Sequence, residues 1–196
     1  MIIHINGASG SGKSTLGNYF KKYKDVVILD TDAFDDPSAL KAMTKFDIDK
    51  QEKKWDQYKG LLNKKKLDEF IKKNHDKTII IIGLLHDGFD KIKVDYGFTI
   101  KIDSETLYKQ YTLRTLKNIK RHHTEITRLI KSKKSQTQKH YYLCYKYEIR
   151  NGLDGEGPIQ LKKSITKKRL EAKKRGYMYA EKNKIRLRIV QLLKNR

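Results

Sequence analysis

The sequence predicts an α/β protein in which helices cover both faces of a parallel sheet, as a three-layer α/β/α arrangement. Two observations support this prediction. Short apolar runs rich in β-branched residues recur along the first half of the chain, at residues 2–5, 26–29, 78–82 and 98–102. The longer segments between and after them carry apolar residues at helical spacing. Short apolar runs of this kind are typical of strands buried in a parallel sheet.

The first apolar run leads directly into a glycine-rich turn with a specific pattern. Gly7, Gly12, Lys13 and Ser14 fit every fixed position of the phosphate-binding pattern G-x-x-x-x-G-K-[ST]. Glycine lets phosphate approach the backbone N–H groups, and a helix beginning near Gly12 directs its positive end to the same place. Lys13 would reach the β- and γ-phosphates, and the Ser14 hydroxyl would bind Mg²⁺. The pattern therefore predicts that ATP and Mg²⁺ bind at Gly7, Ala8, Ser9, Gly10, Ser11, Gly12, Lys13, Ser14 and Thr15.

Two acids follow the second apolar run, which we expect to form a strand beside the phosphate loop. Residues 26–29 end in Asp30, Thr31 and Asp32. Open α/β sheets bind their ligands beyond the carboxyl ends of the strands, and acids two residues apart in extended chain point to the same side. One carboxylate could hold Mg²⁺ through water while the other accepts a proton from a substrate hydroxyl. The alternative is that both are turn or helix-capping residues.

This order of elements resembles the small P-loop kinases, which include shikimate, gluconate, nucleoside and nucleotide kinases. Residues 29–34, Leu-Asp-Thr-Asp-Ala-Phe, are similar to the motif on the second strand of the shikimate and gluconate kinases. The resemblance implies a P-loop NTPase fold, a metal-binding role for Asp30 and a substrate-binding role for Asp32. It covers about residues 1–130 and implies that helices within residues 38–75 hold the acceptor substrate.

The strongest predicted strand covers residues 78–82 and is followed by Gly83. We expect Gly83 to let a substrate approach the backbone. No acid follows the isoleucines directly, which departs from the pattern of motor proteins and GTPases and agrees better with kinases that end this strand in glycine. Asp87 is a candidate acid on the metal side.

A long helix is predicted over about residues 104–131, and its basic residues share one face. Arg114, Lys117, Arg121 and Arg128 are spaced by three, four and seven residues. Small P-loop kinases carry arginines here, at the foot of a lid. The resemblance implies that Arg114, and secondarily Arg121, neutralise charge on the transferred phosphoryl group, which a planar guanidinium matches well. A solvated basic face is the alternative, and it weighs nearly equally for Lys117 and Arg128.

Positive charge is concentrated in the second half of the chain. The net charge is +22, of which residues 1–104, with 19 Lys/Arg and 16 Asp/Glu, contribute only +3. Residues 105–196 hold 26 Lys/Arg against 7 Asp/Glu and contribute +19. This asymmetry indicates a nucleic acid or other polyanion as a partner for residues 105–196, or else a lysine-rich composition on solvated helix faces.

We expect a kinase-like core over residues 1–130 and a basic lid with carboxy-terminal helices, packing on the core, over residues 131–196. Helices are predicted over residues 159–176 and about 181–194. The single cysteine, Cys144, excludes an internal disulfide, no signal peptide is visible, and the longest apolar run is too short to cross a membrane. We therefore expect a cytoplasmic protein without a membrane partner.

The leading interpretation is an ATP-dependent phosphotransferase acting on a small hydroxylated or phosphorylated acceptor, with a nucleoside or nucleotide favoured. A second enzyme interpretation is a 5′-hydroxyl polynucleotide kinase that holds a strand with its basic half. An interpretation from another class is an RNA- or DNA-binding ATPase without an acceptor pocket.

Overall fold

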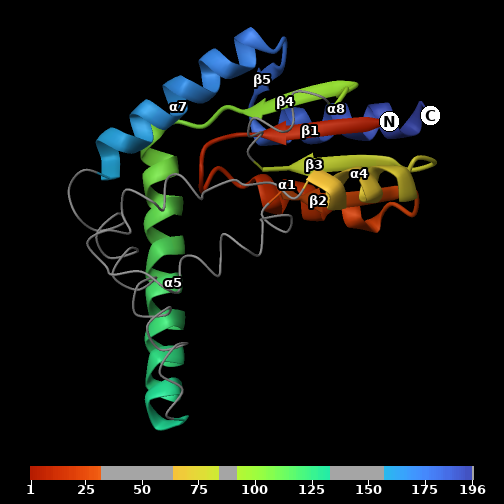
Figure 1. The fold of residues 1–196 in the computed structure, drawn as a ribbon. Coiled ribbons are helices and arrows are strands. Elements are labelled where there is room, and N and C mark those ends of the chain that lie inside the picture. The colour runs from red at the N-terminus through yellow and green to blue at the C-terminus, as the bar shows by residue number, and fades with distance from the viewer. Residues whose placement is uncertain (32–63, 84–91, 133–156, 196) are drawn as a thin grey trace. The chain divides into compact units, whose positions relative to one another are not determined.

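The structure, a computed structural model, describes residues 1–31, 64–83, 92–132 and 157–195 (Figure 1). The chain divides into two compact units. The first combines Met1–Asp36, Gly60–Asp103 and Lys163–Arg196, and the second combines Pro37–Lys59 and Ser104–Lys162. The first unit therefore draws on both sides of the boundary that the sequence suggests after residue 130.

The first unit contains a sheet of five parallel strands in the order β2-β3-β1-β4-β5 (Figure 1). The strands are β1 Ile2–Asn6, β2 Val26–Asp30, β3 Thr78–Ile82, β4 Tyr96–Ile100 and β5 Met178–Ala180. β1 is central, because it pairs with β3 on one side and with β4 on the other. The predicted α/β fold with a parallel sheet is confirmed.

The edge strand β5 is not predicted by the sequence. Its three residues are too few to display either an apolar run or an alternating pattern. They become a strand by pairing with β4, where Phe98 lies opposite Met178 and Ile100 opposite Ala180. β4 also begins and ends two residues before the predicted 98–102, with Asp103 just before the next helix.

The helices agree closely with the predicted ranges. In the first unit they are α1 Lys13–Tyr19, continued by the 3₁₀ turn η1 Phe20–Lys22, then α4 Lys64–Lys73 and α8 Lys182–Lys194. α5, Ser104–Ser132, belongs to the second unit, and α7, Gly157–Lys174, enters the first unit at Lys163. The other helices predicted within residues 38–75 lie outside the described residues. No helix in the described part of the chain has the length and apolarity needed to cross a lipid bilayer.

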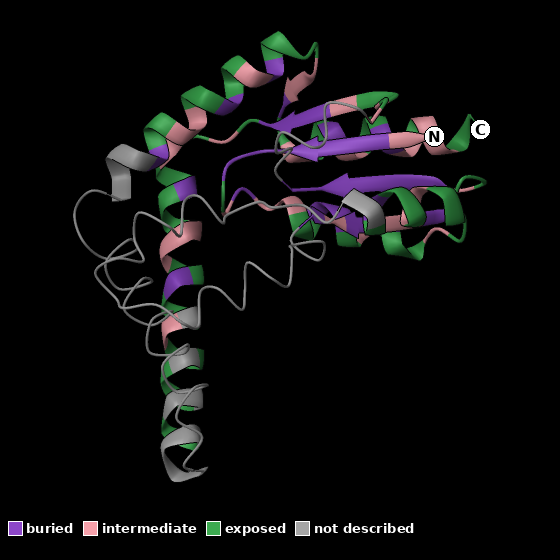
Figure 2. Cartoon of the chain, viewed as in Figure 1, coloured by how far each residue is buried: buried purple, intermediate pink, exposed green. Residues whose placement is uncertain are grey.

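Two apolar clusters hold helices against opposite faces of the sheet. Most residues of the central strands are buried (Figure 2). Ile80 and Ile82 pack with apolar side chains of α1 and α8. Ile79 and Ile81 pack on the other face, with Leu67 of α4. Because successive residues of a strand point to opposite faces, four consecutive isoleucines supply both clusters. This explains why the strand is uniformly apolar rather than alternating.

The β4–β5 side of the sheet is covered by an aromatic ring. Tyr177 precedes β5, and its ring lies directly over Gly97 of β4, where a Cβ atom would collide with the ring. Gly97 is therefore required by close packing in the middle of a strand. This contact places the end of α7 and its polar side chains over the sheet beside β1.

Candidate phosphate-binding site

The glycine-rich loop connects β1 to α1 and has the backbone that its sequence predicts. Gly10 and Gly12 have φ angles of +81° and +87°, in the left-handed region that favours glycine. Gly12 is the residue immediately before α1. Gly7 is needed for a different reason, because a Cβ atom there would lie only 2.6 Å from the Ser11 hydroxyl oxygen. The three glycines thus allow a compact turn.

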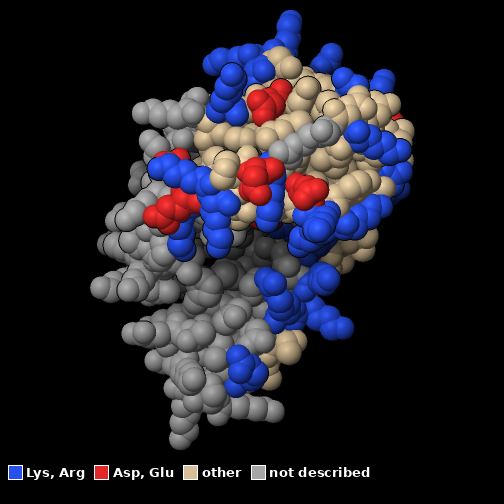
Figure 3. Space-filling model, turned by 90° about the vertical axis from the view of Figure 1, so that its right-hand side faces the viewer, with Lys and Arg blue, Asp and Glu red and all other residues tan. Residues whose placement is uncertain are grey.

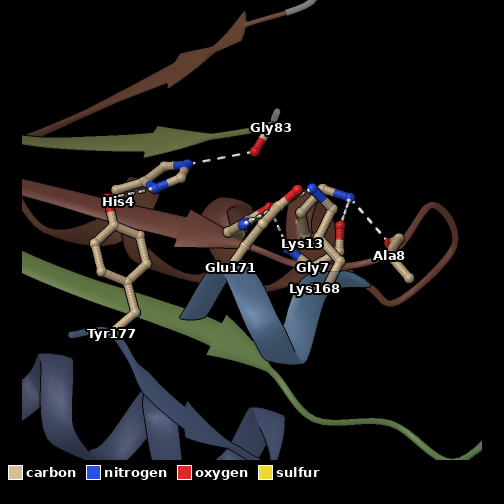
Figure 4. A network of polar contacts seen from close by, with 9 residues as sticks. His4, Gly7, Ala8, Lys13, Gly83, Lys168, Glu171 and Tyr177 are labelled. Carbon is tan, nitrogen blue, oxygen red and sulfur yellow. Dashed lines mark hydrogen bonds and ion pairs between the residues drawn. The ribbon is translucent and has the colours of Figure 1, made fainter. Parts of the chain in front are cut away.

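The side chain of Lys13 folds back across this turn (Figure 4). Its Nζ donates hydrogen bonds to the carbonyl oxygens of Gly7 and Ala8, both at 3.0 Å. An ammonium group forms a stronger hydrogen bond with an anionic oxygen than with a neutral carbonyl oxygen, because opposite charges attract. Lys13 is therefore positioned to exchange these carbonyls for an anionic ligand.

A buried hydroxyl inside the turn also fits a ligand rich in oxygen atoms. The Ser11 side chain is almost completely buried, and its Oγ has no hydrogen-bond partner among the described residues. Leaving such a group unsatisfied costs about 1–3 kcal/mol. Ser14 and Thr15, in contrast, are exposed at the start of α1, where they are accessible to a ligand or a metal ion.

A second lysine borders the turn from α8. A Cβ atom on Gly12 would lie 3.6 Å from Nζ of Lys182, the first residue of that helix. Lys182 lies 169 positions after Lys13 in the sequence, so no local pattern connects the two. Its ammonium adds to the positive potential at the turn.

The position of the turn in the sheet favours ligand binding. The strand order changes direction at β1, with β3 and β2 on one side and β4 and β5 on the other. In open α/β sheets ligands bind outside the carboxyl ends of the strands at such a switch point. The turn follows the carboxyl end of β1 and therefore stands at that position.

Asp30 is not on a strand next to β1. It is the last residue of β2 and pairs with Ile82 of β3, which in turn pairs with Ile5 of β1. β2 is not the strand next to β1, because β3 inserts between them. With neighbouring strands about 4.8 Å apart, the backbones of Asp30 and Ile5 are separated by roughly 10 Å. Asp32 lies outside the described residues.

Gly83 does not provide the open backbone that we expected for a substrate. Its φ angle is +132°, and a Cβ atom on it would collide with the side chain of Thr31. Thr31 is itself buried, so this side chain fills the space that glycine leaves. Gly83 is explained by close packing between the ends of β2 and β3. Asp87 lies outside the described residues.

The predicted basic face is carried by α5. Arg114, Lys117, Arg121 and Arg128 are all exposed on this helix, in the second unit. Their exposure is compatible with a ligand-binding role and with a solvated face alike. The phosphoryl-neutralising role of Arg114 and Arg121 stays a prediction.

Sequence reasoning missed a row of buried polar side chains beside the turn. His4 and Thr99 are completely buried and Asn6 is 2% exposed. In β1, His4 and Asn6 alternate with Ile3 and Ile5 and so face the other side of the sheet. The alternation of apolar and polar residues within residues 3–6 is the signal in the sequence that indicates this second, polar face of the strand.

Asn6 connects the turn to α7 through two hydrogen bonds. Its Oδ1 accepts a hydrogen bond from the backbone N–H of Gly7 at 2.8 Å, and its Nδ2 donates to Oε2 of Glu171 at 3.4 Å. The same Oε2 of Glu171 forms an ion pair with Nζ of Lys168 at 2.6 Å. Burial raises the pKa of Glu171, but Lys168 and the Asn6 amide outweigh it, so the pKa is lowered from its ordinary value.

His4 occupies the adjacent position and joins two distant segments. Its Nδ1 lies 3.1 Å from the Tyr177 hydroxyl, and its Nε2 lies 3.3 Å from the carbonyl oxygen of Gly83. Because a carbonyl can only accept, Nε2 carries the proton and Nδ1 accepts from the tyrosine. Desolvation lowers the pKa of His4 from 6.5 to about 3, with Arg175, Lys168 and Lys13 acting in the same direction. His4 is therefore neutral near pH 7.

Comparison with known proteins assigns the chain to no family. No protein-family model matches the chain, and no curated protein matches it significantly. Among the described residues, no group of three or more His, Cys, Asp or Glu side chains could hold a metal ion. A magnesium ion bound mainly by phosphate oxygens needs only one or two protein ligands, so Ser14 and Asp30 stay the candidates.

Proposed function

We propose that the protein is an ATP-dependent phosphotransferase with a P-loop NTPase fold. The observation that carries this proposal is the glycine turn at the switch point of the sheet, with the Lys13 ammonium held across it by the carbonyls of Gly7 and Ala8. A glycine-rich loop, a lysine ammonium and a buried hydroxyl that has no partner among the described residues are together suited to binding a chain of phosphate groups.

We assign different parts of the nucleotide to different side chains among the described residues. Lys13, supported by Lys182, would balance the negative charge of the phosphates. Ser14 and Asp30 would hold Mg²⁺, which when bound neutralises charge on the phosphates during transfer. Asp30 would act through water, because its strand is not adjacent to β1.

The acceptor side of the proposal rests on the resemblance to small P-loop kinases. Asp32 would orient or deprotonate a hydroxyl of the acceptor, and Arg114 and Arg121 would neutralise the moving phosphoryl group. The acceptor would be a small hydroxylated or phosphorylated molecule, with a nucleoside or nucleotide favoured.

Nucleotide binding can be tested by calorimetry and thermal shift with MgATP and MgGTP. The wild-type protein should bind at least one of them at millimolar concentration or below, and its melting temperature should rise with ligand. Lys13→Met should abolish the shift. Lys73→Met removes an exposed lysine from α4 and is the matched control. Failure of the wild-type protein to bind either nucleotide would refute the proposal.

Phosphoryl transfer can be tested by screening nucleosides, nucleotides, sugar acids and short oligonucleotides for ADP release with MgATP. Asp32→Asn should abolish transfer to an acceptor that the wild-type protein uses while leaving ATP affinity within about threefold, since Asp32 is assigned to the acceptor. Equal transfer rates in the two proteins would remove Asp32 from the mechanism.

A second candidate function is favoured by one observation, the charge of the carboxy-terminal segment. Residues 163–196 contain 13 Lys/Arg but only two acids, Glu171 and Glu181. Lys and Arg side chains also outnumber acidic ones on the face shown in Figure 3. A 5′-hydroxyl polynucleotide kinase or a nucleic-acid-binding ATPase would bind single-stranded RNA or DNA with a steep dependence on salt. Absence of a complex at low salt would exclude both.

A further inference from the structure

The ion pair between Lys168 and Glu171 is unusual in its burial. The two residues lie one turn apart on α7, with Nζ and Oε2 2.6 Å apart and side-chain exposures of only 11% and 31%. Lys168 is the one lysine or arginine that is buried among the described residues. A poorly solvated ion pair contributes little net stability, because desolvation offsets the attraction. Its position therefore needs another explanation.

The contacts of Glu171 lead directly to the phosphate turn (Figure 4). Its Oε2 accepts from the amide of Asn6, whose Oδ1 accepts from the N–H of Gly7. The carbonyl of the same Gly7 accepts from Lys13. An amide between an N–H donor and a carboxylate acceptor has only one favourable orientation, so Glu171 and Gly7 together fix the Asn6 side chain. The chain of contacts spans 165 residues of sequence.

We infer that Glu171 is a positioning residue for the phosphate turn and that Lys168 neutralises it. Glu171 holds the Asn6 amide, and the amide holds the first peptide of the turn. A lone carboxylate at this place would repel the phosphates of a nucleotide, and the Lys168 ammonium cancels that repulsion. The inference rests on the proposed nucleotide binding.

The two halves of the pair should respond differently to substitution. Glu171→Ala removes the acceptor of the Asn6 amide and should weaken MgATP binding about three- to tenfold. Glu171→Gln keeps a carbonyl oxygen for that amide, so its affinity should equal or exceed that of the wild type. Lys168→Met removes the ion-pair partner of the Glu171 carboxylate and should weaken ATP binding about tenfold. The loss should be smaller for AMP, which carries less charge.

The decisive variant combines Lys168→Met with Glu171→Gln, which removes both charges and keeps the acceptor. Its ATP affinity should return to within about threefold of wild type. Asn6→Ala and Glu171→Ala should be non-additive, because they interrupt the same chain of contacts. Lys174→Met, an exposed lysine on the same helix, is the matched control. Calorimetry gives the affinities, and circular dichroism confirms that each variant is folded.

Four results would count against the inference. If wild-type protein binds ATP and both Lys168→Met and Glu171→Ala behave like Lys174→Met, the pair does not act on the site. If the double variant fails to recover, or if ATP and AMP lose equal affinity, the pair has only a structural role. If wild-type protein binds no nucleotide, the proposed function is refuted, and the inference is refuted as well because it depends on nucleotide binding.

Discussion

Lowering the pH should destabilise this protein through His4 before its carboxylates titrate. His4 is fully buried between Tyr177 and Gly83, and its pKa falls from 6.5 in the unfolded chain to about 3 in the folded protein. Between pH 6.5 and about pH 3, His4 is mainly protonated in the unfolded state and neutral in the folded state. The free energy of unfolding is therefore unaffected above pH 6.5 and decreases as the pH falls from 6.5 towards 3.

The magnitude follows from the difference between the two pKa values. Each pH unit in this interval costs about 1.4 kcal/mol for one group, so lowering the pH from 7 to 5 should cost about 2 kcal/mol. For a chain of this size the melting temperature should fall by roughly 4–8 °C. Glu171, whose pKa is lowered, contributes mainly below pH 5.

The assay is urea unfolding followed by circular dichroism at several pH values between 7 and 5. His4→Gln is the comparison, because its amide can donate to Gly83 and accept from Tyr177 without titrating. Only the difference in slope between the two proteins is attributed to His4, so a uniform loss of stability in the variant does not matter. Parallel pH profiles would refute a buried neutral His4.

Three further predictions concern the packing of the sheet. Thr99→Val should leave the free energy of unfolding unchanged or raise it by about 1 kcal/mol, because the buried Thr99 hydroxyl has no hydrogen-bond partner among the described residues. A clear loss of stability in urea unfolding would show that the hydroxyl does have a partner. Gly97→Ala should cost about 1–3 kcal/mol, because its Cβ collides with the Tyr177 ring, and the cost should shrink in a Tyr177→Leu background. Ile80→Ala should cost about 2–5 kcal/mol in the same assay, and a loss below 1 kcal/mol would contradict its complete burial.

The glycine-rich turn was predictable because all its backbone requirements are local. The residues that form it are contiguous, and the left-handed conformations of Gly10 and Gly12 need glycine in any fold. The isoleucines of β3 and the helical spacing of apolar residues in α8 likewise indicate, within a single element, which residues are buried. Sequence alone therefore determined the fold class, the residues of the turn and, within the described residues, most helix and strand bounds.

The tertiary structure decided which distant segments meet. A crossover between parallel strands can leave room for another strand, so the sequence could not show that β3 lies between β1 and β2. β5 exists only through its pairing with β4, and the space at Gly83 is filled by Thr31. Glu171 reaches Asn6 because α7 returns over the sheet. Such contacts leave no periodic signal in the chain, since they depend on how the elements pack and not on the local preference of any residue.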